Sequence, residues 1–247
     1  MIIGVVTTLV ASAIVGLWAF ARRWLKRGAP LFVTGEVLVP KAWEMVLPTD
    51  DALPQHVPEG ERSYLPMYRL LRKRGAADFK ATTVKLLVEN RTEQPLTITN
   101  IGVQKIQQGA PFSAAWVRYP PAGAAGAIVL DFFLDEEHPD AWEASYEDSI
   151  TQLTRSGNRP YFDGNFITLS PGESQSLLIT GRAEAIRCSW TLEIEVVQAG
   201  KRRIIDLVPE GGPLFTSGTP AAGFQRQLEW SWYEGADAAF VAPPWLT

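Results

Sequence analysis

Apolar and polar residues alternate along much of this chain, which is the pattern of β-strands that bury one face. The alternation begins in residues 31–39 and returns at Val84, Leu86 and Val88. Between Ile98 and Ile101 the apolar positions change from even to odd numbers. A shift by one residue within a strand is typical of a β-bulge, so we expect one near Asn100.

Three further segments also predict strands. Residues 127–134 are almost entirely apolar, as in a central strand, and residues 224–232 favour a closing strand. Residues 188–208 alternate on both sides of Gln198–Lys201, which predicts a hairpin with Cys188 on its buried face. In total we expect about nine strands.

Two segments predict helices. Around residues 139–156, Trp142, Tyr146, Ile150 and Leu153 recur at the spacing of one helical stripe. We therefore expect one amphipathic helix inserted near 139–156. Residues 68–75 predict one or two further helical turns that end at Gly75.

The first residues predict a membrane anchor. Residues 2–20 carry no charge, and a helix of that length rises about 28 Å, close to the hydrocarbon thickness of a bilayer. The basic side chains that follow the apolar run favour a cytoplasmic location for the rest of the chain; they are Arg22, Arg23, Lys26 and Arg27. Two alternatives are an export signal cleaved after Ala21 and a buried core helix.

Small residues recur at intervals of four within this predicted span, at Gly4, Thr8, Ser12 and Gly16. Helices in lipid associate along such stripes, so the stripe favours contact with another membrane protein or with a second copy. The alternative is chance, because small residues are common in membrane spans. The basic cluster predicts contact with the lipid bilayer itself.

These patterns divide the chain into three parts. Residues 1–27 form the anchor and its basic flank, and residues 28–78 hold a strand, a Pro-rich linker and a short basic segment. Residues 79–247 form a β-sandwich domain with the helical insertion. The phrases "VKLLVENRTEQPLTITNIGV" and "ITLSPGESQSLLITG" resemble immunoglobulin-like β-sandwiches of bacterial envelope proteins. This resemblance implies an antiparallel sandwich and brings no catalytic residues.

Charge and composition exclude several functions. The chain has a net charge of −4, and the part after residue 27 is more acidic, which argues against nucleic acid as a partner. A single cysteine excludes an intrachain disulfide. Two histidines without ligand spacing predict no zinc site, and phosphate-binding, dinucleotide-binding and nucleophile-elbow motifs are missing from the sequence.

Two features leave alternatives open. The acidic segment 131–140 is compatible with a Ca²⁺ site, but it also suits the start of the predicted helix. The nine tryptophans are compatible with a carbohydrate platform. Trp18 and Trp24 belong to the predicted membrane segment, four others fall on apolar faces that predict a core (Trp142, Trp190, Trp230 and Trp232), and a core or a hydrophobic lid is favoured for the remaining three. We therefore expect no catalytic residue, metal, cofactor or small-molecule substrate.

The sequence thus predicts a non-enzymatic, single-pass membrane protein whose β-sandwich serves protein interaction or scaffolding. The alternative is an exported cell-envelope module that binds a glycan or another surface ligand. A hydrolase without a recognisable motif is a third interpretation.

Overall fold

The computed structural model describes most of the chain after residue 30, in the ranges 31–38, 43–55, 57, 60, 63–119, 128–146, 153–209, 211–230 and 240–241. No helix within these ranges is both long and apolar enough to cross a membrane. The predicted anchor, its basic flank and its stripe of small residues all fall in residues 1–27. They lie outside the described residues, so the anchor stays a prediction.

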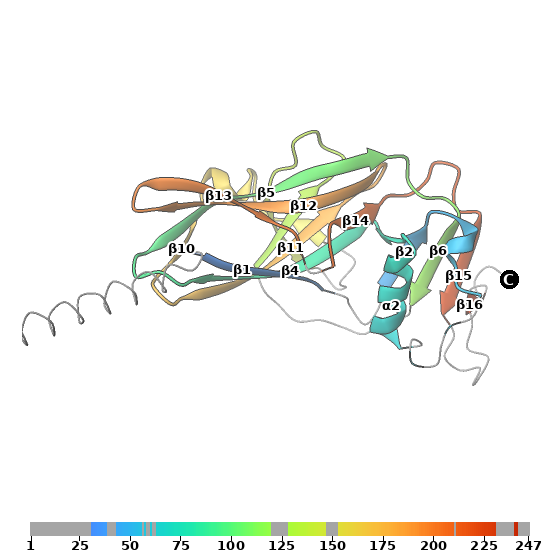
Figure 1. The fold of residues 1–247 in the computed structure, drawn as a ribbon. Coiled ribbons are helices and arrows are strands. Elements are labelled where there is room, and N and C mark those ends of the chain that lie inside the picture. The colour runs from blue at the N-terminus through green and yellow to red at the C-terminus, as the bar shows by residue number, and fades with distance from the viewer. Residues whose placement is uncertain are drawn as a thin grey trace, which may run out of the picture.

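The described part of the protein is mainly β, with two mixed sheets and one α-helix (Figure 1). The first sheet has six strands in the order β1-β4-β11-β7-β8-β9. Its neighbours are antiparallel except for β11 and β7, which run parallel. The strand bounds are Leu31–Val37 (β1), Ala81–Asn90 (β4), Ile128–Phe133 (β7), Trp142–Tyr146 (β8), Leu153–Arg155 (β9) and Ser174–Arg182 (β11).

The second sheet has ten strands, of which nine follow the order β10-β5-β12-β14-β3-β2-β6-β15-β16. The strand bounds are Trp43–Leu47 (β2), Ala77–Phe79 (β3), Leu96–Gly109 (β5), Ala115–Tyr119 (β6), Ile167–Leu169 (β10), Arg187–Gln198 (β12), Lys201–Leu207 (β13), Leu214–Ser217 (β14), Arg226–Trp230 (β15) and Phe240–Val241 (β16). Strand β5 pairs with one edge of β12 along almost its whole length. Strands β14 and β13 share the other edge of β12, so the sheet divides there.

Apolar side chains from both sheets form the larger core. Val84, Leu86 and Val88 of β4 are fully buried, as their alternation predicts, and Trp190 and Leu192 of β12 are buried with them. The two sheets therefore pack face to face over this part of the molecule. Burying this apolar area is the main favourable contribution to folding.

A smaller core lies where the second sheet extends beyond the first (Figure 1). Helix α2 (Tyr64–Lys73) packs Met67 and Leu71 against β2, β6 and β15. Trp43 stacks on Tyr119 with ring centroids 5.1 Å apart. The helix is followed by Gly75 at a φ of +85°, a conformation that glycine adopts without steric cost. Two short 3-10 helices complete the elements of the described residues, η1 (Asp50–Ala52) and η3 (Tyr161–Asp163).

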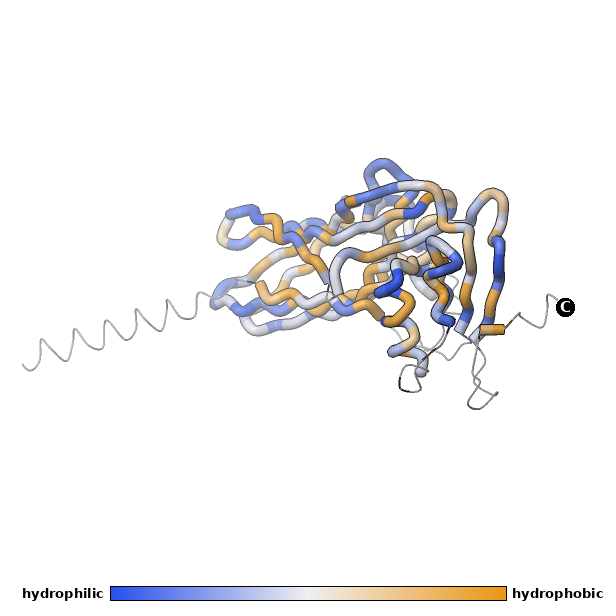
Figure 2. The backbone as a smooth tube through the Cα atoms, turned by 45° about the vertical axis from the view of Figure 1, so that its right-hand side comes forward, coloured by the Kyte–Doolittle hydropathy of each residue, from blue (hydrophilic) through white to orange (hydrophobic). Residues whose placement is uncertain are grey.

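Several predicted elements are confirmed. Strand β1 occupies the first alternating segment, and β12 and β13 form the predicted hairpin with a hydrophilic tip (Figure 2). The register between β5 and β12 shifts at Glu195 and Val196, opposite Asn100 and Ile98, which is the expected bulge. The strand count exceeds the expected nine because many strands have only two to five residues.

The helix predicted near 139–156 is wrong. Trp142–Tyr146 and Leu153–Arg155 are strands β8 and β9, which pair with each other at the edge of the first sheet. Trp142 and Tyr146 are four residues apart, and this spacing places two residues on one face of a strand as well as of a helix. Residues 147–152 lie outside the described part of the chain.

Candidate functional site: the open edge of strand β5

The acidic side chains of segment 131–140 take part in separate interactions. Asp131 pairs with two arginines, and Asp135 accepts hydrogen bonds from the backbone N–H groups of Glu184 and Ala185, each at 2.8 Å. Glu137 and His138 point into solvent, with side chains 91% exposed. Within the described part of the chain, no three His, Cys, Asp or Glu side chains lie close enough together to hold a metal ion.

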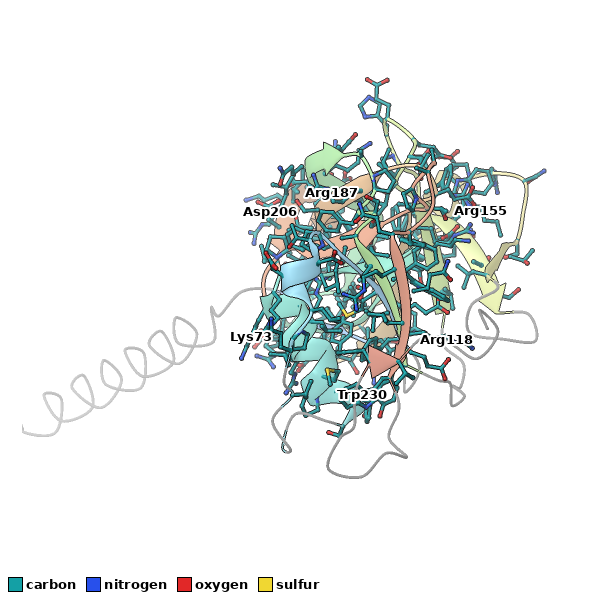
Figure 3. The ribbon with its side chains drawn as sticks, turned by 90° about the vertical axis from the view of Figure 1, so that its right-hand side faces the viewer. Lys73, Arg118, Arg155, Arg187, Asp206 and Trp230 are labelled. Atoms are coloured by element: carbon teal, nitrogen blue, oxygen red, sulfur yellow. The ribbon has the colours of Figure 1, made fainter. Side chains whose placement is uncertain are left out.

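Asp131 is the centre of a buried ion-pair cluster on the outer side of the first sheet. Its fully buried carboxylate accepts two hydrogen bonds from Arg182, at 2.7 and 2.6 Å, and one from Arg155 at 2.8 Å. The hydrogen bond to Asp131 raises the pKa of Arg182. Arg155 also lies 5.2 Å from the ring of Trp142, on the side of the molecule away from Lys73 (Figure 3). These contacts offset the cost of burying the carboxylate and give the cluster a structural role.

A second buried carboxylate, Asp78, joins α2 to both sheets. It accepts hydrogen bonds from Tyr68 Oη at 3.2 Å and Thr82 Oγ1 at 2.7 Å. Thr82 also lies 2.7 Å from the hydroxyl of Thr216, which accepts a 3.0 Å hydrogen bond from Trp190 Nε1. We call these five residues the junction network. Burial raises the pKa of Asp78 above its ordinary value.

Cysteine and tryptophan offer no reactive or exposed site among the described residues. Burial raises the pKa of Cys188 to about 11, so its thiol stays protonated and unreactive at neutral pH. Trp43, Trp190 and Trp230 are buried. Trp116 is half-buried, and its Nε1 donates to Glu44 at 3.3 Å. The described tryptophans therefore form no flat, exposed platform for a carbohydrate.

Strand β5 has one edge that is mostly unpaired. It is fourteen residues long, but β10 pairs only with Leu96–Ile98. Beyond that point, residues 99–109 pair with β12 on one side and with no described strand on the other. In an antiparallel pair, alternate residues direct their N–H and C=O groups away from the partner. We call residues 99–109 the open edge, since these groups have no backbone partner in the described part of the chain.

A polar groove of about 400 Å³ runs beside the open edge. It lies between β5 and the loop that follows β7, and its lining residues are Asn100, Gly102, Val103, Lys105, Gln108, Glu137, His138, Pro139 and Glu193. Lys105 donates from Nζ to the backbone oxygen of Glu136, which ties this loop to the strand. The groove therefore has strand backbone on one wall and a loop on the other.

Gly102 allows Glu193 to reach the groove. Glu193 belongs to β12 and lies opposite Gly102 in the register. A Cβ atom added at Gly102 would lie 3.0 Å from the carboxylate oxygen of Glu193, so the glutamate side chain lies across the space that a larger residue would fill. Gln104 donates to the same carboxylate at 3.0 Å. The groove thus receives a negative charge from the neighbouring strand.

The open edge carries only part of the protection that natural sheet edges have, since the loop after β7 lies beside it and Lys105 is its one charged residue. Charged side chains, prolines and covering loops normally discourage unwanted strand pairing. Residues 99–109 contain one charged residue, Lys105, and no proline. Ile106, which has no partner in the β12 register, is 58% exposed. Such an edge is a template for another extended segment.

The sequence did not indicate this site. The predicted functional residues fall in residues 1–27, outside the described part of the chain, and the structure brings together a different set. Comparison of the chain with family models, curated proteins and solved structures found no match.

Proposed function

We propose that the chain is a non-enzymatic, single-pass membrane protein whose β-rich part serves protein interaction or scaffolding at the membrane. In this proposal the two facing sheets form an immunoglobulin-like sandwich held in the cytoplasm by the segment 1–27. The observation that carries the proposal is the open edge of β5, because exposed strand backbone recognises other proteins. The dispersed acidic residues and the unreactive cysteine support a role other than catalysis.

The direction of the strands supports an arrangement relative to the bilayer. Leu31 follows the basic Arg27 by four positions and lies opposite Asn90, at the end of the sandwich that also holds the β4–β5 turn. The tip of the β12–β13 hairpin reaches the same end, where Gln198 donates to Thr92. An anchor before Leu31 would therefore hold this end toward the bilayer.

In this arrangement the open edge would extend away from the membrane surface. Strand β5 begins at Leu96, just after the turn, and continues to Gly109. At about 3.3 Å per residue, its far end lies about 40 Å from its start. A partner in the cytoplasm, or the soluble part of another membrane protein, would have access to it.

The location is tested with two reporters fused after Thr247, one active only in the cytoplasm and one active only outside. We expect activity of the cytoplasmic reporter and recovery of the intact chain in the membrane fraction. Activity of the outside reporter would contradict the proposed location and favour the exported envelope module. Sequencing the mature N-terminus would detect cleavage after Ala21.

A further inference from the structure

We propose that the groove along β5 binds an extended segment of a partner protein, which adds to the sheet as a strand and directs a Lys or Arg side chain toward Glu193. This inference rests on the proposed interaction function and names the site and the chemistry of its partner. Three observations carry it: backbone of residues 99–109 that has no second strand partner in the described part of the chain, a Glu193 carboxylate that forms no ion pair there, and the direction of β5.

The backbone supplies the affinity. The open edge spans eleven residues, 99–109, next to a groove of about 400 Å³. An added strand forms hydrogen bonds with every second residue of its neighbour and leaves alternate side chains to determine specificity. Arg187, opposite Gly109 in the register, marks the far end of β5 in Figure 3.

The charges favour a basic side chain in the partner. Glu193 supplies a carboxylate to the groove. Glu137 also belongs to the lining, but its side chain is 91% exposed and its carboxylate lies 3.9 Å from His138 Nε2. The one lysine in the lining, Lys105, donates to the backbone oxygen of Glu136 and forms no ion pair with either glutamate among the described residues. By contrast Glu195, two positions along β12, already pairs with Arg202. A Lys or Arg side chain of the partner would form an ion pair with the carboxylate of Glu193.

The direction of β5 argues against a second copy as the occupant. Two identical strands that pair antiparallel are related by a two-fold axis perpendicular to both of them. Since Leu31 lies at the end where β5 begins, such a dimer would place the two membrane segments at opposite ends. Both anchors could not then enter the same bilayer. A separate extended segment has no such restriction.

The test uses an eight-residue peptide of alternating Thr and Val with one central Lys, capped at both ends and carrying a thiol. It is joined by a disulfide to an Ile106→Cys variant of the full chain in detergent, because tethering raises the effective concentration of a weak ligand to about the millimolar range. The native Cys188 is buried and does not compete. Amide hydrogen exchange is measured with and without the peptide.

We expect exchange within residues 99–109 to slow at least tenfold in the conjugate. The same peptide with N-methylated backbone amides should give no slowing, because it lacks the donors for strand pairing. The matched control is Leu87→Cys, where an exposed residue lies on β4, whose two edges are both paired. Complete conjugation at residue 106 without slowing in β5, or equal slowing with the N-methylated peptide, would overturn the proposal.

The charge is tested with the free peptide. Glu193→Gln should weaken its binding two- to fivefold, as expected for a partly exposed ion pair, whereas Glu195→Gln should leave binding unchanged. Equal binding of a peptide with Glu in place of Lys would refute the role of Glu193. The reporter fusions are read in cells without the peptide, so they fail or succeed independently of these results.

Discussion

The junction network and the open edge of β5 both contain polar groups, but they use them differently. In the junction, Asp78, Thr82, Thr216 and the indole of Trp190 are hydrogen-bonded to one another and are all buried. Along the open edge, outward-facing backbone groups have no backbone partner among the described residues, and the carboxylate of Glu193 forms no ion pair there. The same types of group thus hold the fold together in one region and are available to a partner in the other.

This difference separates stability from binding. A buried polar group that loses its partner keeps its desolvation penalty without a compensating hydrogen bond. Changes in the junction network should therefore lower the free energy of unfolding. Changes along the open edge should alter peptide binding and leave unfolding nearly unchanged. The predictions below test this separation, beginning with the largest effect.

Two glycines provide a matched pair for the same substitution. Gly181 lies beneath the ring of Trp190 in the core, and an added Cβ would overlap the ring. Because Trp190 is fully buried and its indole is hydrogen-bonded to Thr216, Gly181→Ala should lower the free energy of unfolding by about 3 kcal/mol. Gly102→Ala, which meets only the flexible side chain of Glu193, should change it by less than about 1 kcal/mol. Urea denaturation measures both, and equal losses would contradict the comparison.

Thr216→Val removes the hydroxyl at the centre of the junction network. The indole N–H of Trp190 would stay buried without an acceptor, and Thr82 would lose one of its partners. We expect a loss of about 2 kcal/mol in the free energy of unfolding, with unchanged affinity for the Lys peptide. A variant with native stability would show that the network does not hold the two sheets together.

Asp78→Asn should change how stability depends on pH. Since burial raises the pKa of Asp78 in the folded state, its contribution to stability is full below its ordinary value of 3.8 and is lost as the pH rises through the raised pKa. The wild-type protein should therefore lose stability relative to Asp78→Asn as the pH rises above about 4. Urea midpoints between pH 3 and 8 measure this difference.

Glu195→Gln is the control for which stability should depend on pH in the opposite direction. Burial opposes ionisation of Glu195, but hydrogen bonds from Thr99 and Arg202 outweigh it and lower the pKa of Glu195. Its contribution is present above its ordinary value of 4.5 and is lost as the pH falls through the lowered pKa. The same slope for both variants would contradict the assignment of Asp78 as a carboxylate destabilised by burial.

Ile106→Thr should have the smallest effect on stability. Because Ile106 is 58% exposed, its replacement by another β-branched residue should change the free energy of unfolding by less than about 0.5 kcal/mol. Differential scanning calorimetry checks this. A large drop in melting temperature would mean that Ile106 is packed against part of the protein and that the edge is closed.

The sequence predicted local structure better than it predicted the site. The alternation of apolar and polar residues located β1, β4 and the β12–β13 hairpin, because every second residue of a strand lies on the same face. The same reasoning was wrong for β8, since residues four apart share a face in both strands and helices. The Ca²⁺ alternative at residues 131–140 depended on side chains meeting, and the structure separates them.

The open edge depends on which strands pair with one another across long distances in the chain, and a single sequence does not indicate this pairing. Gly102 meets Glu193 only because β5 pairs with β12, about ninety residues later in the chain. Among the described strands, residues 99–109 have no second partner because β10 is only three residues long. The signals that sequence does contain are the length of the alternating segment and its single charged residue, Lys105.

Photo-crosslinking in cells tests the central claim most directly. A photoreactive amino acid is placed at Gln107, on the open edge, or at Leu87, on the fully paired strand β4, in the full-length chain. We predict adducts of defined mass from position 107, with the crosslinked peptides mapping to one extended, Lys- or Arg-containing segment of a partner. Equal adducts from position 87, or adducts from 107 that contain only this chain, would contradict the claim that β5 accepts a strand from another protein.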